Sequence, residues 1–277
     1  MSDCQPCVSV ACCPPSDFGY YSDMVEVWQI ADFGMNDANE VAVASWLNAK
    51  APTTILTAGD NDYVGSYASS VGIHYPRPIR RQRLFPCMGN HDWDYANGTA
   101  YASYFTWLNS ARYYDVRMGP VHFFILDSGW NTARVLREGD GNAPDSLQAQ
   151  KMLSRARSST APFKIGVIHH PPYFSGNAHG PADENADLRW DYAGAGIQAV
   201  ISGHEHSYER LDIGGVQYLV NGLGGAAING FNSPVEGSVI RYNALRGALR
   251  IRARQNRLDM TFFNTLDVAV DSVTINA

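Results

Sequence analysis

Short apolar runs alternate with amphipathic segments along the first two thirds of the chain. Residues 25–31 have the composition and length of a strand, and residues 39–49 place apolar side chains at the spacing of one helix face. Continuous apolar runs such as 121–126 suit strands in a sheet that is covered on both faces. Further strands are predicted at residues 53–58, 84–88, 164–168 and 197–201, and a second helix at residues 146–157.

The last part of the chain shows strand patterns only, at residues 216–220, 238–242, 248–254 and 258–263. Helices that alternate with strands, followed by consecutive strands, are typical of layered folds with two sheets. The sequence therefore predicts an α/β fold, a layered sandwich of two mixed β-sheets flanked by helices. We expect one domain over residues 23–277, after a leader over residues 1–22 that is rich in Cys and Pro.

Length and charge narrow the possible functions. The chain has 277 residues, enough for one large hydrophobic core. Its apolar runs are far shorter than the ~20 residues that a membrane-spanning helix needs, so we expect no membrane partner. Its formal net charge is −6, whereas proteins that coat nucleic acids need clustered Lys and Arg, so we expect no nucleic-acid partner either.

Four of the five cysteines, Cys4, Cys7, Cys12 and Cys13, lie in the leader. Such a cluster can bind zinc or form local disulfides. Adjacent Cys12 and Cys13 fit poorly as two ligands of one tetrahedral ion, so we interpret the leader as a flexible segment without a metal. The leader lacks the apolar core of a secretory signal peptide, so the sequence itself predicts no compartment.

Polar segments stand directly after five of the predicted strands. Ligand-binding groups of α/β sheets gather beyond the carboxyl ends of the strands, and glycine lets the backbone approach a bound group closely. Each segment alone has the composition of an ordinary turn, but turns alone rarely produce all five in order. The segments are Asp32-Phe33-Gly34, Gly59-Asp60-Asn61-Asp62-Tyr63, Gly89-Asn90-His91-Asp92, His169-His170-Pro171-Pro172 and Gly203-His204-Glu205-His206.

The residue types in these segments suit a site with two metal ions. Two ions about 3.5–4 Å apart can clamp the attacking and leaving oxygens of a phosphoryl transfer. Such a pair needs one bridging carboxylate, with imidazole nitrogens and hard oxygen atoms as the other ligands. The His-x-His turn at residues 204–206 can give one imidazole to each ion.

In their order, the five segments resemble the motif series of the calcineurin-like metallophosphoesterases. Tyr63 in the second motif, Gly34 rather than His in the first, and Tyr208-Glu209-Arg210 after the last are similar to the purple acid phosphatase branch. The motifs span residues 32–206, so the resemblance implies a metallophosphoesterase-like catalytic domain over residues 23–277. We expect no room in this chain for the N-terminal β domain of the plant members.

The resemblance also implies the metal ligands, which we carry over residue by residue. The fourth motif leaves a choice: counting from Val167 selects His170, whereas the His-x-Pro spacing selects His169. We favour His169, because the strand before it keeps the length that the family has, and His170 stays as the alternative. The implied ligands are Asp32, Asp60, Tyr63 and His206 for the first metal and Asp60, Asn90, His169 and His204 for the second, with Asp60 bridging.

The ligand types also indicate which metals to expect. A free tyrosine has a pKa of ~10, so a phenolate at Tyr63 below neutral pH implies a strongly charged hard ion, Fe³⁺, in the first site. The second site suits Zn²⁺, Mn²⁺ or Fe²⁺, since mixed nitrogen and oxygen ligands do not separate these ions.

Finally, the resemblance implies hydrolysis of phosphate monoesters by a metal-bound hydroxide, as in an acid phosphatase, with a small phosphoester as substrate. A histidine would protonate the leaving alkoxide. His91 and His179 are the candidates, and we favour His91 because Asp92 beside it can raise its pKa. A phosphodiesterase for cyclic nucleotides or glycerophosphodiesters is the first alternative, and a non-catalytic, metal-stabilised binding module is the second. The family is often secreted, which favours an extracellular protein.

Overall fold

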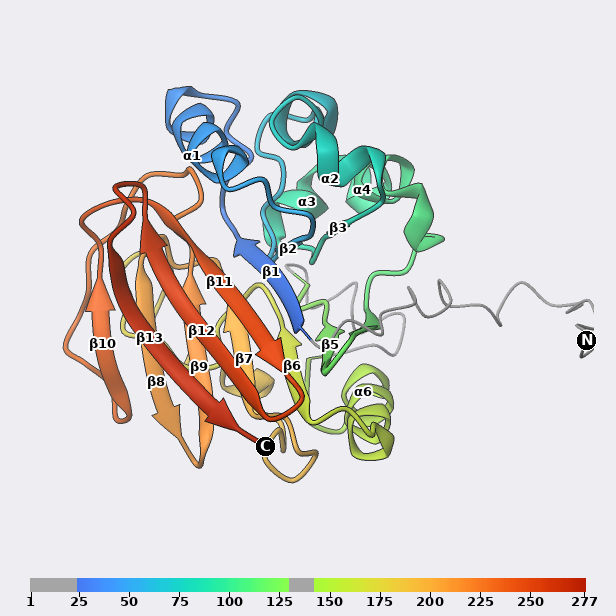
Figure 1. Ribbon diagram of the computed structural model, residues 1–277, viewed down its shortest axis with the longest axis vertical. Helices are drawn as coiled ribbons and strands as arrows, with labels where there is room; N and C mark the ends of the chain where they lie inside the picture. Colours follow the sequence, from blue (N-terminus) through green and yellow to red (C-terminus); the bar gives the residue numbers. More distant parts are fainter. Residues whose placement is uncertain (1–23, 130–141) are drawn as a thin grey trace, which may run out of the picture.

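The computed structural model describes residues 24–129 and 142–277, so the leader and its four cysteines lie outside the described residues. Two mixed β-sheets pack against each other, and helices lie against their outer faces (Figure 1). This confirms the α/β sandwich that the sequence predicts. The helices are α1 (Ala38–Ala49), α2 (Pro76–Arg80), α3 (Asn90–Asp94), α4 (Thr99–Tyr104) and α6 (Leu147–Ser158).

The first sheet has the strand order β13-β12-β11-β1-β2-β3. β1 pairs with β2 and β2 with β3 in parallel, while the other pairs in this sheet are antiparallel. The strands are β1 (Met24–Ile30), β2 (Ile55–Thr57), β3 (Leu84–Phe85), β11 (Gly247–Arg254), β12 (Arg257–Asn264) and β13 (Ala269–Asn276).

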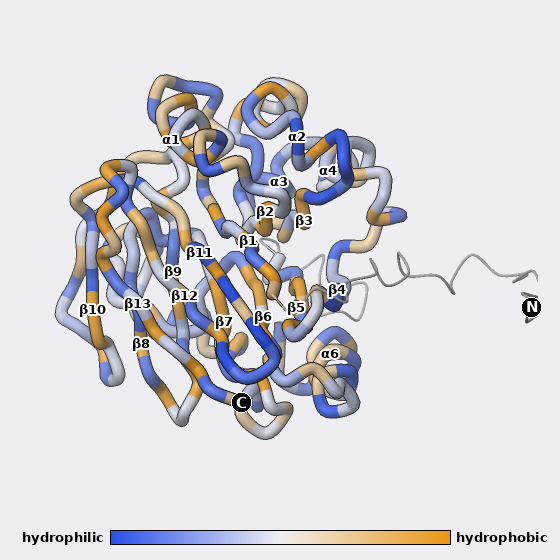
Figure 2. Tube along the Cα trace, in the orientation of Figure 1, coloured by the Kyte–Doolittle hydropathy of each residue, from blue (hydrophilic) through white to orange (hydrophobic). Residues whose placement is uncertain are grey.

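The second sheet has the order β10-β8-β9-β7-β6-β5-β4, and its central strands β5, β6, β7 and β9 run parallel. Figure 2 shows hydrophobic residues along β5, β6 and β7, as expected for parallel strands that are buried on both faces. The strands are β4 (Tyr114–Met118), β5 (Val121–Ile125), β6 (Phe163–Val167), β7 (Ala199–Ser202), β8 (Tyr208–Ile213), β9 (Val216–Asn221) and β10 (Ser238–Tyr242).

Alternate residues of the strands supply three apolar clusters. Val27 of β1 and Ile165 of β6 belong to the cluster between the sheets, which fixes the sheets face to face. Trp28, the next residue of β1, packs on the other side with Leu47 of α1. Phe124 of β5 packs with residues of α6 on the outer face of the second sheet. Because all three clusters are continuous with the central strands, the carboxyl ends of these strands are held rigidly.

Some strand bounds differ from the prediction. β3 ends at Phe85, because Pro86 has no N–H to continue the pairing, and its carbonyl instead accepts hydrogen bonds from Tyr101 and Tyr114. Three strands, β4, β8 and β13, are not among those that the sequence predicts. β13 is an edge strand with mostly exposed or half-buried residues, so pairing with β12 rather than an apolar pattern defines it.

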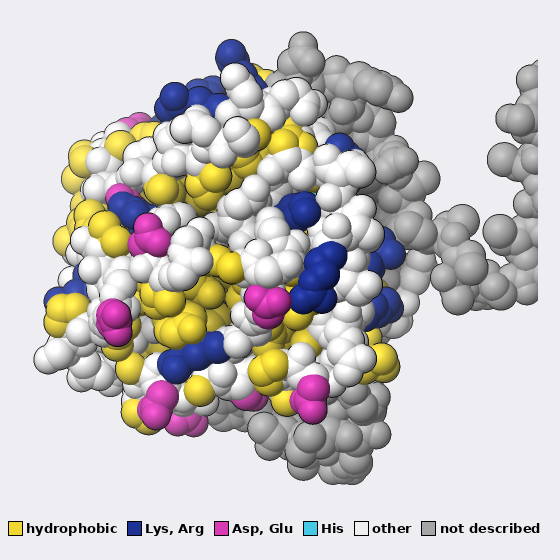
Figure 3. Space-filling model, turned by 90° about the horizontal axis from the view of Figure 1, so that it is seen from below, with side chains coloured by type: hydrophobic (Ala, Val, Ile, Leu, Met, Phe, Trp, Pro, Cys, Tyr) yellow, Lys and Arg dark blue, Asp and Glu magenta, His cyan; other side chains and the backbone are white. Residues whose placement is uncertain are grey.

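The central strands also determine where polar groups gather. The face seen in Figure 3 shows hydrophobic, basic and acidic side chains in a mixture and no histidine among the described residues. His169, His170, His204 and His206 of the last two motifs lie instead beyond the carboxyl ends of β6 and β7. No helix in the described ranges has the length and apolar character to cross a membrane.

Candidate metal centre

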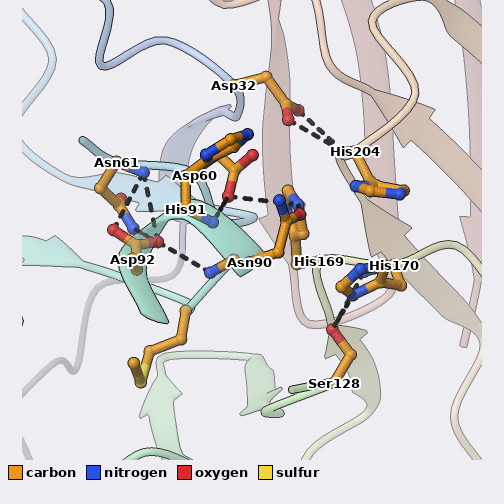
Figure 4. Close-up of polar contacts among 12 residues, drawn as sticks. Asp32, Asp60, Asn61, Asn90, His91, Asp92, Ser128, His169, His170 and His204 are labelled. Carbon is orange, nitrogen blue, oxygen red and sulfur yellow. Dashed lines mark hydrogen bonds and ion pairs between the residues drawn. The ribbon is translucent and has the colours of Figure 1, made fainter. Parts of the chain in front are cut away.

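The five motifs meet where the carboxyl ends of β1, β2 and β3 in the first sheet face those of β6 and β7 in the second (Figure 4). Parallel strands bring their following loops to the same edge of a sheet, which explains why segments far apart in sequence converge. The structure brings together every side chain that the sequence analysis proposes as a ligand, and places both candidate acids beside them.

The predicted ligands of the first metal surround the Tyr63 hydroxyl. Its Oη atom lies 2.9 Å from Oδ2 of Asp60, 3.4 Å from Oδ1 of Asp32 and 3.5 Å from Nε2 of His206. Both carboxylates are buried. Three acidic or phenolic oxygens and one imidazole nitrogen therefore converge on one point, as a hard, highly charged cation requires.

The predicted ligands of the second metal gather around His169. Its Nε2 atom lies 3.0 Å from Oδ1 of Asn90 and 3.4 Å from Oδ1 of Asp60, and its ring centre is 5.0 Å from that of His204. His170 lies on the other side of His204 and its Nδ1 is 2.7 Å from Oγ of Ser128. The contacts with Asp60 and Asn90 favour His169 over His170 as the ligand.

Backbone hydrogen bonds orient the rings of His169 and His206 so that their Nε2 atoms can face a cation. Nδ1 of His169 lies 2.8 Å from the carbonyl oxygen of Ala58, and Nδ1 of His206 lies 2.9 Å from that of Ala227. Since a carbonyl only accepts, each Nδ1 donates, and in the neutral ring each Nε2 then presents a lone pair to a nearby carboxylate oxygen. Acceptors that face acceptors in a buried site need a cation between them, either a proton on Nε2 or a metal ion, so these ligand atoms fit a metal ion.

The pKa shifts of three ligand side chains also describe the charge that the site favours. Burial lowers the pKa of His169, but the charge and hydrogen bond of Asp60 raise it more, to about 9. Burial raises the pKa of Asp60, but the charge and hydrogen bond of His169 lower it more, so this carboxylate is ionised. Burial raises the pKa of Tyr63, and the charges of Asp60 and Asp32 raise it further. The site therefore attracts positive charge, and Tyr63 ionises only beside a strong cation.

Two of the motif glycines are required by close contacts. A Cβ atom on Gly59, whose φ is +94°, would lie 2.3 Å from Nδ1 of His169. A Cβ atom on Gly89 would lie 2.1 Å from Oδ1 of Asp60. Only glycine lets these two backbone segments approach the ligands so closely.

Asp92 does not orient His91, which corrects the sequence-based interpretation. In the short helix α3, Asp92 points inward and accepts hydrogen bonds from the Gly89 backbone at 2.8 Å and from the Tyr67 hydroxyl at 2.8 Å. The His91 ring points outward, and its Nδ1 pairs with Oδ2 of Asp94 at 2.9 Å. Residues three apart share a helix face, whereas adjacent residues do not. Asp92 thus fixes the turn before Asn90 rather than the histidine.

His91 nevertheless lies at the site. Its backbone N–H donates to Oδ1 of Asp60 at 2.9 Å, and its ring centre is 4.3 Å from that of Tyr63. The imidazole is 40% exposed, so it faces solvent on the side of the first predicted metal.

His179 lies on the opposite side, next to the second predicted metal. Its ring centre is 4.2 Å from that of His204. Its Nδ1 lies 3.3 Å from Oε1 of Glu205, a carboxylate that is 1% exposed and has no hydrogen-bond partner among the described residues. A second carboxylate, Glu209, accepts hydrogen bonds from the backbone and hydroxyl of Ser175 at the start of the same loop.

Glu205 and Glu209 therefore position the loop that carries His179, and sequence reasoning did not assign them this role. Their place in the sequence does point to the site, since Glu205 and Glu209 lie within the run from Gly203 to Arg210 that carries the last motif. Their partners lie about thirty positions earlier, in a loop that has no regular pattern, so the contact itself could not be read from the sequence.

Comparison with known proteins identifies the family. A model of the calcineurin-like phosphoesterase family matches residues 25–208, which is more than half of the chain. The chain belongs to this family. A curated relative, a phosphoenolpyruvate phosphatase from Allium cepa, is 23% identical over 203 residues. These residues cover 65% of this chain and 40% of the relative, so the chain spans less than half of that protein's length.

Solved structures confirm the fold. The purple acid phosphatase PPD1 from yellow lupin (Lupinus luteus) seeds is similar over 91% of this chain and 54% of its own, with a TM-score of 0.74 and 16% identity. GAP50 of Plasmodium, described as the anchor in the inner membrane complex, is similar over 91% of this chain and 89% of its own, with a TM-score of 0.67 and 17% identity. The similarity to the lupin structure shows that the chain has the fold of a purple acid phosphatase.

Proposed function

We propose that this protein is a dinuclear metal-dependent hydrolase of phosphate monoesters, similar to an acid phosphatase. The observation that carries the proposal is the convergence of the seven predicted ligands in two overlapping sets. We assign Fe³⁺ to the first set and Zn²⁺, Mn²⁺ or Fe²⁺ to the second. Bound there, the metals would activate a water molecule and stabilise the negative charge on the phosphate oxygens.

Asp60 is the residue that joins the two sets. Its Oδ2 atom faces the hydroxyl of Tyr63, and its Oδ1 atom faces Nε2 of His169. One carboxylate with an oxygen toward each set is the arrangement that a bridging ligand needs. We therefore propose Asp32, Asp60, Tyr63 and His206 as the first set and Asp60, Asn90, His169 and His204 as the second.

We propose that His179, rather than His91, donates the proton to the leaving alcohol. A pocket of about 450 Å³ opens beside His204, and His179 lines it while His91 does not. An alkoxide that departs into this pocket meets the imidazole of His179. The sequence-based preference for His91 depended on Asp92, which contacts neither histidine in the described hydrogen bonds.

Metal analysis and turnover on one purified sample test the proposal. We expect two metal ions per chain and faster turnover of p-nitrophenyl phosphate than of bis-p-nitrophenyl phosphate. A chelator should abolish the activity, and returning Fe³⁺ and Zn²⁺ should restore it. Faster turnover of the diester would favour a phosphodiesterase instead.

A non-catalytic binding module is the alternative from another class. The similarity to GAP50, the anchor in the inner membrane complex of Plasmodium, is the observation that favours it. The complete ligand set opposes it, because a module without chemistry has no need for two overlapping metal sites. A protein that binds two metals but hydrolyses none of a panel of phosphoesters would support this alternative.

Tyr63→Phe tests the assignment of the first metal. A phenolate bound to Fe³⁺ gives a visible charge-transfer band, so the wild-type protein should be coloured and the variant should lose the band. The ring packing against His91 is retained in the variant, since only the hydroxyl is removed. The measurement is the visible spectrum together with the iron content. An iron-loaded, oxidised wild type without colour would exclude tyrosinate ligation.

A further inference from the structure

The pocket beside the proposed metal centre has a defined chemical character. His204, His179 and His170 form its inner end, so the alcohol part of a substrate occupies it when the phosphate lies at the metals. Its lining also includes Ser128, Gly129 and the segment that follows His179. The groups on these walls decide which alcohol fits.

The walls carry negative charge. Glu184 and Asp187 both line the pocket, and none of its described lining residues is Lys or Arg. Glu184 lies close to the reacting end, because a Cβ atom on Gly180, the residue after His179, would be 3.2 Å from its Oε2. Both carboxylates belong to exposed residues, so they are accessible to a substrate.

The amide groups of the pocket add hydrogen-bond acceptors. Nδ2 of Asn185 donates to the carbonyl oxygen of Pro171 at 3.1 Å, which leaves its Oδ1 as the group available to a ligand. Oδ1 of Asn142 is buried and has no hydrogen-bond partner in the described part of the chain. A ligand that donates hydrogen bonds therefore matches these walls better than one that only accepts.

Among the described residues, the nearby guanidinium of Arg189 does not offset this charge. The guanidinium of Arg189 donates to the carbonyl oxygens of Pro172 and Ala182, both at 2.9 Å, and stacks on Tyr173. It lines a different pocket. His179 has the buried carboxylate of Glu205 behind it, so this pair adds no net positive charge.

From these contacts we propose that the preferred substrates are phosphate monoesters of amino alcohols, with the ammonium group held between Glu184 and Asp187. The inference rests on the proposed phosphatase function and specifies its leaving group. The same walls disfavour leaving groups with a carboxylate. The Allium cepa relative is named for phosphoenolpyruvate, which carries such a carboxylate, so this chain should differ from it in substrate.

A series of two-carbon substrates of equal length tests the proposal. O-phosphoethanolamine carries an ammonium, 2-hydroxyethyl phosphate is neutral at that position, and 2-phosphoglycolate carries a carboxylate. We expect kcat/KM to fall in this order, with roughly a tenfold difference between the first and the last, since exposed charge pairs are individually weak. The difference should shrink as salt is added.

The double variant Glu184→Gln/Asp187→Asn should change kcat/KM for the two charged substrates in opposite directions. kcat/KM should fall for O-phosphoethanolamine and rise for 2-phosphoglycolate, a crossover that a general loss of structure would not produce. Asp183→Asn is the matched control, because Asp183 is an exposed acid in the same segment that lines the other pocket. This control should keep the wild-type ratio.

These experiments distinguish a wrong substrate assignment from a wrong phosphatase function. Turnover of p-nitrophenyl phosphate without a preference for O-phosphoethanolamine over the neutral substrate would overturn the amino-alcohol assignment and leave the phosphatase intact. An equal loss on both charged substrates in the double variant would also overturn it. A metal-loaded protein that hydrolyses none of these esters would instead contradict the phosphatase function.

Discussion

The Asp60→Asn variant is expected to lose metal from both sites. Its kcat/KM for phosphate monoesters should fall more than about 100-fold, which is a larger effect than substitution of a residue that only supports a metal ligand. Asp60 is the one side chain with an oxygen directed at each ligand set. An asparagine keeps the shape but brings no charge and offers only one oxygen, so it cannot bridge. The measurements are metal content per chain and kcat/KM for p-nitrophenyl phosphate.

The fold should survive this substitution, because neutral asparagine removes a buried charge rather than adding one. Circular dichroism and the melting temperature of the metal-free protein check this. Asp191→Asn is a suitable control, since Asp191 is exposed and pairs with Arg157 away from the site. Two metals per chain and near-normal turnover in Asp60→Asn would remove Asp60 from the bridging position.

The second large effect is an expected fall in kcat/KM for alkyl phosphates in the His179→Ala variant. An alkoxide of high pKa must be protonated as it leaves, and a positioned acid contributes ~10²–10⁴-fold. p-Nitrophenolate leaves largely unaided, so its release should be affected much less. kcat/KM for both substrates, with metal content measured on the same samples, gives the comparison.

His91→Ala is the companion variant. His91 contacts Tyr63 on the side of the first predicted metal and does not line the pocket, so we expect a similar change on both substrates. If His91→Ala is selective for the alkyl ester and His179→Ala is not, the two roles are exchanged. The exchange would restore the preference that the sequence suggests.

The elements that could be predicted from sequence are those that a local pattern determines. Apolar runs located β1, β5 and β6 within a few residues, because burial on both faces requires such runs. The ligand motifs stood out because Asp60, Asn90 and His204 each follow a glycine at a strand end. Chain topology then brings these ends together.

The remaining features depend on contacts between distant segments. The carbonyls of Ala58 and Ala227, which orient His169 and His206, belong to backbone groups that leave no trace in the residue type. The pairing of His179 with Glu205 depends on how an irregular loop folds back. Adjacency in sequence predicts a contact between Asp92 and His91, whereas the helix turns these neighbouring side chains apart.

The origin of the ligands in two different sheets has a mechanical consequence. Asp32, Asp60, Tyr63 and Asn90 follow strands of one sheet, whereas the histidines follow strands of the other, and each ligand set draws on both. Metal ions held there would act as cross-links that clasp the two layers at one end. Binding to the native state alone adds to the free energy of unfolding. Removing the metals should therefore loosen the sandwich at this edge first, with faster amide exchange at the ends of β2 and β7 than in β12.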